Sequence, residues 1–331
     1  MRPTHPRETF ARVATIVGLC LSTTALAADP QSVPGTRRPA DAAISAQAQT
    51  PKTFGSPQQA ADALIAAADQ FDVRVLEELF GSTGKNLVLS GEAAQDRQRA
   101  KDFVAAAREK TRVSVDPARK TRAFLLVGNE DWPFPVPIVK RGAKWAFDAR
   151  AGRQELFYRR IGANELDAIA ICRGYVDAQH EYALKTREGY EVNQYAQRII
   201  GTPGKQDGLA WQNSDGTWDG PVGEKVARAI EQGYKSGAPY HGYFFKVLTR
   251  QGSAAPLGAM DYVVKGAMIG GFALAAAPAE YGVTGVKTFI VSHDGVVYEK
   301  DFGRVTLAEF KKMERFNPDA SWTPVLEIDI E

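Results

Sequence analysis

The chain has 331 residues, of which 44% are hydrophobic and 24% are charged, and its formal net charge is +2. This length exceeds what one hydrophobic core usually organises, so we expect two domains. The near-neutral charge excludes the strongly basic surface with which proteins bind nucleic acid. The two cysteines exclude a fold held together by several disulfides.

Residues 1–27 have the three parts of a signal peptide. Three arginines give a positive start, residues 13–25 are mostly apolar, and small residues precede a cleavage site after Ala27. An uncleaved membrane anchor is the alternative, but this run is shorter than the ~20 apolar residues that span a bilayer. We therefore expect a soluble periplasmic protein with no membrane span after removal of the signal peptide.

Cleavage after Ala27 would change both the charge and the thiol content of the chain. The segment carries three arginines, one glutamate and Cys20, so the mature chain would be formally neutral and Cys172 would be its one thiol. A single thiol cannot form an internal disulfide, and stability must then come from packing.

Residues 28–53 are rich in Pro, Ala, Gln, Ser and Thr without an apolar period, which predicts a disordered linker. Helices follow. Ser56, Pro57 and Gln59 have the spacing of a capping box with proline at the first helical position. Asp72 is expected to cap a second helix that ends at Gly81. A third helix is predicted over 92–110.

The pattern then changes to strands, over 121–127, 134–140 and 144–148. In the last of these, large apolar residues alternate with Lys144, Ala146 and Asp148, so Trp145 and Phe147 should face the core. Helices followed by a curved antiparallel sheet predict an α+β domain over residues 54–160. This order of elements resembles cystatin-like, cone-type folds.

A second α+β domain is predicted over residues 161–331. After a break at Gly162, Asn164 should cap a long helix that continues to about residue 184. Asp294-Gly295 between two β-rich runs predicts a hairpin. The other predicted elements are a short helix over 192–200, a loop over 201–220, a helix over 221–233, strands over 243–249, 263–264, 272–274, 288–292 and 296–298, a connection over 275–285, a helix over 307–313 and an extended tail over 322–330.

Six segments of the sequence resemble one exported bacterial family, called domain of unknown function 2950 (DUF2950). The resemblance covers roughly residues 54–322, and no established activity comes with it. These segments are residues 129–135, 161–166, 175–179, 201–209, 239–243 and 277–285.

The second half is also similar to pilin-like domains, in which a long helix packs on an antiparallel sheet. A pilin begins that helix with an apolar, membrane-spanning half near the amino end. Here the helix is expected to start inside the chain, at Asn164. The resemblance therefore implies a fold and no filament assembly.

The strongest candidate for a ligand-binding residue is His241, because histidine titrates near neutrality. It lies between Tyr240 and Tyr243, whose rings could form the walls of a small cleft. The alternative is an aromatic strand edge whose histidine bonds backbone. Trp132 and Phe134, with the neighbouring prolines, could form an exposed aromatic ridge for a peptide or glycan, or pack between the two domains.

The remaining reactive residues do not form a catalytic pattern, so no catalytic residue, metal or cofactor is predicted. His180 lacks the second histidine of a zinc protease helix, and His293 is expected to be solvated in a turn. Cys172 should face inward on its helix. Three aspartates could bind calcium only if the fold brought them together: Asp207, Asp215 and Asp219.

Three functions are consistent with this sequence. The first is a non-enzymatic envelope protein that binds or scaffolds another protein. The second is a small-molecule or glycan-binding protein, which would use a cavity in the first domain or a cleft near His241. The third is an envelope hydrolase with His241 as base and an acidic partner such as Asp261.

Overall fold

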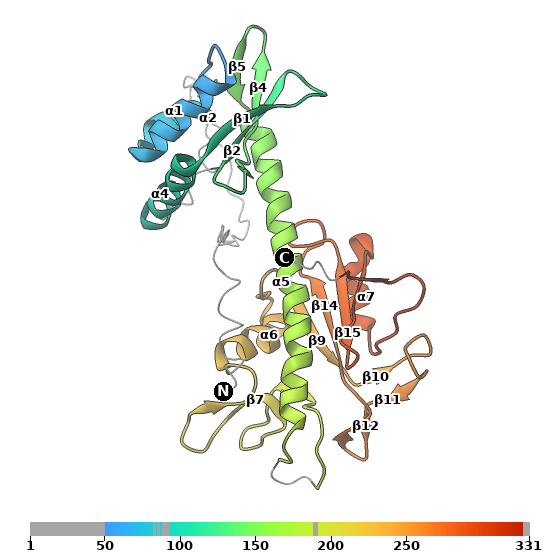
Figure 1. Cartoon of the computed structure of the whole chain (residues 1–331). Helices are drawn as coiled ribbons and strands as arrows, with labels where there is room; N and C mark the ends of the chain where they lie inside the picture. The colour runs from blue at the N-terminus through green and yellow to red at the C-terminus, as the bar shows by residue number, and fades with distance from the viewer. Residues whose placement is uncertain (1–49, 82–83, 85–86, 88–92, 188–190, 327–331) are drawn as a thin grey trace, which may run out of the picture. The chain divides into compact units, whose positions relative to one another are not determined.

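The computed structural model describes residues 50–81, 84, 87, 93–187 and 191–326 (Figure 1). The predicted signal peptide, nearly all of the predicted linker and the end of the predicted tail lie outside these residues. The chain divides into two compact units, the first ending at Tyr158 and the second beginning at Arg159. Among the described helices, none is both long and apolar enough to cross a membrane.

The first unit is α+β, with helices packed on an antiparallel sheet (Figure 1). Strand order in the sheet is β1-β2-β4-β5, with β3 paired to β2. The helices are α1 (Pro57–Asp69), α2 (Val73–Phe80) and α4 (Ala93–Glu109), and the strands are β1 (Thr111–Val115), β2 (Arg122–Val127), β3 (Trp132–Pro133), β4 (Ile138–Arg141) and β5 (Lys144–Phe147).

The predicted helix caps of this unit are confirmed. Ser56 Oγ accepts a hydrogen bond from the Gln59 amide at 3.2 Å. The Gln59 side chain reaches back to the amide of Gly55, one residue further than a capping box requires. Asp72 accepts from the Val75 amide at 3.1 Å, and α2 ends before Gly81, whose φ is +73°.

The core of the first unit lies between the helices and the inner face of the sheet. Residues alternate along β2, where Ala123, Leu125 and Val127 are buried. The ring of Phe147 packs against Phe80 at a centroid distance of 5.0 Å. Phe134 completes this aromatic cluster. The prediction that Trp145 and Phe147 face the core is confirmed.

One strand prediction in this unit is partly wrong. The run 134–140 is not continuous: only Ile138–Arg141 is strand, and a separate short strand, β3, precedes it. Pro135 and Pro137 have no amide hydrogen to donate to a ladder, so the intervening residues leave the sheet. Strand β1, which was not predicted, forms the edge next to β2.

The second unit is also α+β and contains the long helix α5 (Ala149–Ala183), whose first residues belong to the first unit. Its main sheet has the order β17-β16-β15-β14-β9. Its strands and helices are β6 (Arg198–Ile200), β7 (Gly208–Gln212), β8 (Trp218–Asp219), α6 (Glu224–Ser236), β9 (Tyr243–Leu248), β10 (Arg250–Gln251), β11 (Met260–Asp261), β12 (Val263–Val264), β13 (Ala267–Met268), β14 (Ala273–Pro278), β15 (Thr288–Ser292), β16 (Val297–Lys300), the 3₁₀ helix η2 (Gly303–Val305), α7 (Thr306–Lys312) and β17 (Thr323–Pro324).

Helix α5 continues through Gly162, so the predicted break and the predicted cap at Asn164 are wrong. A glycine inside a helix costs only about 1 kcal/mol relative to alanine, which a 35-residue helix can absorb. Asn164 instead donates from Nδ2 to the carbonyl of Thr284 at 2.8 Å.

Helices α5 and α7 cover opposite faces of the main sheet (Figure 1). Phe272 packs on Tyr175 of α5, whereas Lys246 of β9 donates to the carbonyl of Phe310 in α7. Lys246 pairs with Ala275, and side chains alternate along β14. Phe272 and Ala275 therefore point to different faces, and every residue of β14 and β15 is buried.

Local signals predicted the β15–β16 hairpin correctly, but not the connections around it. Gly295 has a φ of +77°, and Asp294 accepts from the Ser292 hydroxyl. Strand β14 extends to Pro278, beyond the predicted end at residue 274. The predicted helix over 192–200 contains strand β6, and the predicted loop over 201–220 contains β7 and β8.

We expect Phe147→Ala to lower the free energy of unfolding by about 3–5 kcal/mol, because it leaves a cavity among packed aromatic rings. Chemical denaturation of the chain from Ala28 onward measures the effect. The control is Val115→Ala on edge strand β1, whose side chain is exposed and whose effect should stay within about 0.5 kcal/mol. A loss below about 1 kcal/mol for Phe147→Ala would contradict this core assignment.

Candidate functional site

His241 lies at the tip of a tight turn that leads into β9. Tyr240 and Tyr243 exchange both backbone hydrogen bonds, each at 3.0 Å. The two residues between them, His241 and Gly242, have positive φ angles of +48° and +76°. These features define a type I′ turn, which requires positive φ at both central positions. The turn therefore fixes the direction in which the imidazole projects.

The imidazole of His241 is held by Asp167 of α5. Nδ1 lies 2.6 Å from Oδ2 of Asp167, and the two side chains are 36% and 29% exposed. The alternative that this histidine bonds backbone is wrong. Asp261, suggested as its acidic partner, instead pairs with Arg250 in the β10–β11 hairpin at 3.5 Å.

Asn164 and Glu165, which precede Asp167 on α5, hydrogen-bond to the backbone of the segment that follows β14. These contacts hold the 240–243 turn against the helix. Asn164 bonds the Thr284 carbonyl, and a Cβ on Gly242 would lie 2.5 Å from Asn164 Nδ2. Glu165 accepts hydrogen bonds from the amides of Val286 and Lys287, at 2.8 and 3.0 Å. The absence of a side chain at Gly242 permits this close approach.

The two tyrosines of the turn have different roles. Tyr243 is buried, and its hydroxyl donates to the carbonyl of Lys287, so it anchors the turn in the core. Burial raises the pKa of its hydroxyl. Tyr240 is half-buried, and its ring meets that of His241 edge-on at a centroid distance of 4.4 Å. Burial, followed by the charge of Asp167, raises the pKa of Tyr240.

Trp132, the fourth predicted ligand-binding residue, lies in the first unit. It forms part of β3 and is exposed. His241 belongs to the second unit, so each residue is described within its own unit. Phe134, the other aromatic residue of the predicted ridge, is buried in the core of the first unit, so that part of the prediction is wrong.

Three of the sequence segments that resemble one family come together around His241. These segments contribute Asn164 and Glu165, the 240–243 turn and the residues around Thr284. A family model described as "Protein of unknown function (DUF2950)" matches residues 51–325. The chain belongs to this family. No curated protein matches the chain. Solved structures give no match either.

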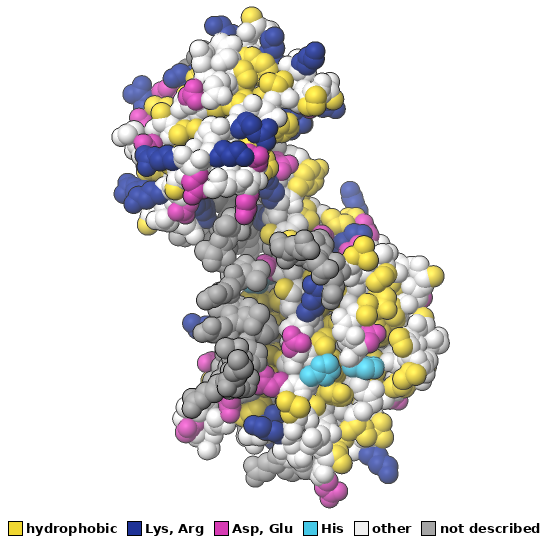
Figure 2. Space-filling model, in the orientation of Figure 1, with side chains coloured by type: hydrophobic (Ala, Val, Ile, Leu, Met, Phe, Trp, Pro, Cys, Tyr) yellow, Lys and Arg dark blue, Asp and Glu magenta, His cyan; other side chains and the backbone are white. Residues whose placement is uncertain are grey.

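The other two described histidines of this DUF2950 protein lie around Phe272. The ring of His180 is 5.6 Å from that of Phe272, and the ring of His293 is 6.2 Å from it. The expectation that His293 is simply solvated is wrong, because its Nδ1 is buried without a hydrogen-bond partner. Figure 2 shows histidine side chains beside each other on the surface of the second unit.

The other candidates have structural explanations. Cys172 is fully buried, as predicted, and burial raises the pKa of its thiol to about 12, so it is not a nucleophile near neutral pH. The three aspartates bind their own loops, Asp207 to Thr202, Asp215 to Thr217 and Asp219 to the Gly220 amide. Within the described ranges, no three His, Cys, Asp or Glu side chains are arranged to hold a metal ion.

The Asp167–His241 pair can orient an imidazole for proton transfer or for hydrogen bonding. A carboxylate at Nδ1 favours the tautomer with the proton on Nδ1, and it leaves the Nε2 lone pair as an acceptor. Sequence reasoning missed Asp167, because it lies 74 residues from His241 and only the packing of α5 brings them together.

We expect the neutral imidazole of His241 to carry its proton on Nδ1, because Asp167 accepts it. Ring ¹⁵N chemical shifts at alkaline pH measure the tautomer. Asp167→Asn should reduce the Nδ1-protonated population and cost less than about 1 kcal/mol of stability, since the pair is partly exposed. Asp261→Asn is the matched control and should leave the shifts unchanged. A wild-type Nε2–H tautomer would contradict the assignment.

Proposed function

We propose that this chain is an exported, non-enzymatic recognition protein that binds another envelope protein through the 240–243 turn and Asp167. The first 27 residues support export, since they have the composition of a signal peptide. The helix-on-sheet plan of the second unit supports a pilin-like domain, and the helices on one face of the first sheet support a cone-type domain.

The observation that carries the proposal is the 2.6 Å contact between Asp167 and His241 at a partly exposed turn. The turn and the carboxylate pre-organise the imidazole, which lowers the entropy lost when a partner binds it. The half-buried ring of Tyr240 adds an aromatic surface of the kind that protein interfaces favour.

The surroundings of the pair support recognition more than catalysis. In the described part of the chain, neither His241 nor Asp167 hydrogen-bonds to a serine, threonine or cysteine side chain. Acidic and basic side chains are interspersed on the visible face of the second unit (Figure 2). A partner is then recognised by shape and a few hydrogen bonds rather than by a single-sign charged surface.

A photo-crosslinking amino acid in place of Tyr240, in cells that export the protein, should yield one specific protein adduct. His241→Ala should reduce its yield about fivefold or more, as expected for a hot-spot residue worth at least ~1 kcal/mol. The crosslinker at the exposed Lys205 of the same unit is the matched control. An equal adduct from both positions, or no adduct from Tyr240, would refute the proposal.

The short Asp167–His241 distance also favours a second candidate, a hydrolase. His241 Nε2 would take a proton from water, the resulting hydroxide would attack a carbonyl carbon, and the proton would pass to the leaving group. Asp167 would orient the imidazole and stabilise its protonated form.

This candidate predicts that the chain from Ala28 onward hydrolyses at least one member of a panel of esters and amides. His241→Ala should lower kcat by roughly 10²- to 10⁴-fold, the usual contribution of a general base. His180→Ala, another histidine on the surface of the second unit, should retain the wild-type rate. Absence of turnover across the panel, or equal rates for both variants, would eliminate the hydrolase.

A further inference from the structure

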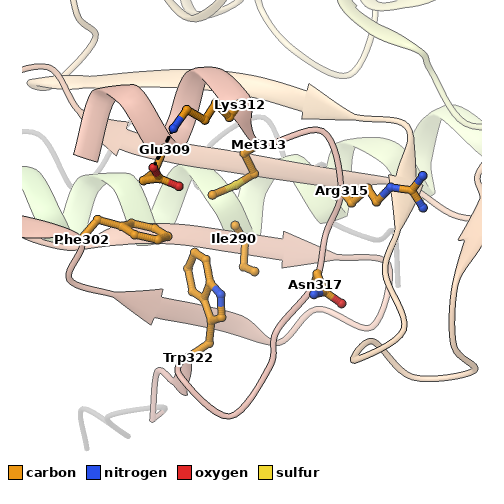
Figure 3. A pocket seen from close by; sticks show the side chains of 8 residues that line it. All are labelled: Ile290, Phe302, Glu309, Lys312, Met313, Arg315, Asn317 and Trp322. Atoms are coloured by element: carbon orange, nitrogen blue, oxygen red, sulfur yellow. Dashed lines mark hydrogen bonds and ion pairs between the residues drawn. The ribbon is translucent and has the colours of Figure 1, made fainter. Parts of the chain in front are cut away.

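A pocket of about 180 Å³ opens on the α7 face of the main sheet (Figure 3). It lies within the second unit, on the face opposite to the one that α5 covers. Ile290 of β15 forms its floor in the middle of the view. The residues that line it are Ile290, Phe302, Glu309, Lys312, Met313, Arg315, Asn317 and Trp322.

One side of the pocket is an aromatic corner. The rings of Phe302 and Trp322 meet nearly at right angles, with centroids 5.6 Å apart. The ammonium group of Lys300 lies 4.6 Å from the centroid of Phe302 and 5.8 Å from that of Trp322, and it donates to Ser321 Oγ at 2.6 Å. Cation–π contacts and this hydrogen bond hold both rings in place.

The other side is polar, and positive charge exceeds negative charge there. Glu309 and Lys312 on α7 form an ion pair at 3.2 Å, which is drawn in Figure 3. Arg315 is exposed at the far end of the pocket. The side chain of Asn317 accepts a hydrogen bond from the Ala254 amide, so it has a fixed position. The lining therefore carries two cations, Lys312 and Arg315, and one carboxylate, Glu309.

We propose that this pocket binds one acidic sugar residue of a glycan. A sugar ring has an apolar C–H face that packs on aromatic rings, and hydroxyl groups that need hydrogen-bonding side chains around them. An apolar ligand would make no use of the guanidinium group of Arg315, and an inorganic anion would leave the aromatic corner unused. The excess of cations selects a sugar that carries a carboxylate.

The size of the pocket agrees with one sugar residue of a longer oligosaccharide. Pockets that enclose whole drug-sized ligands measure about 300–1,000 Å³, whereas this one has about 180 Å³. The site is on a different face from His241 and uses none of its residues, so it goes beyond the proposed function. Loss of protein binding at His241 would leave glycan binding unchanged, and the reverse also holds.

The test is calorimetric titration of the chain from Ala28 onward with oligosaccharides that contain galacturonic, glucuronic or N-acetylmuramic acid. The methyl esters of the same oligosaccharides serve as uncharged ligands of the same shape. We expect at least one acidic oligosaccharide to bind, and its ester to bind about fivefold more weakly or worse. Trp322→Leu should weaken binding of the acid about tenfold or more.

Two variants separate the ring contact from the charge contact. Arg315→Gln changes an exposed side chain, so the variant should fold. It should reduce the preference for acid over ester, while the sugar ring still packs on the aromatic corner. Lys205→Gln, at an exposed position of the same unit that does not line the pocket, is the matched control and should change nothing. Three results would overturn the proposal: no oligosaccharide bound at millimolar concentration, an acid affinity that both Trp322→Leu and Arg315→Gln leave unchanged, or Trp322-dependent binding of acidic peptides instead of glycans.

Discussion

The architecture of the second unit depends on the burial of two adjacent strands, β14 and β15, on both faces. Every residue of these strands is buried, so each face of the sheet must be covered by another element. Four of the six residues of β14 are alanines, and small side chains let a helix approach the backbone closely. The long helix α5 supplies one cover and the short helix α7 supplies the other.

This arrangement places the two candidate sites on opposite faces of one sheet. On the α5 face, the helix brings Asp167 to the turn that begins β9. On the α7 face, the helix is too short to cover the sheet completely, and Ile290 is left as the floor of a pocket. Lys246 ties the C-terminal carbonyls of α7 to β9, which stabilises that helix end and limits its movement over the sheet.

Features set by neighbouring residues were predictable from the sequence, and features set by distant contacts were not. The caps at Ser56 and Asp72 and the hairpin at Gly295 follow from local hydrogen bonds and backbone preferences. His241 could be singled out because of its aromatic and glycine neighbours. Its partner Asp167 could not be identified, since nothing in the local pattern distinguishes that carboxylate from others on the polar side of α5.

Asn164 was predicted to cap a helix because its side chain can hydrogen-bond to backbone groups. It does form such a bond, but with a loop that packs against the helix. Residues 279–287 connect β14 to β15 outside the ladder, so their backbone groups need partners from elsewhere. Asn164 and Glu165 provide three of these hydrogen bonds from the middle of a continuous helix. Polar residues of the cap-forming type thus bind a neighbouring loop, and this attachment brings the next turn of α5 within reach of His241.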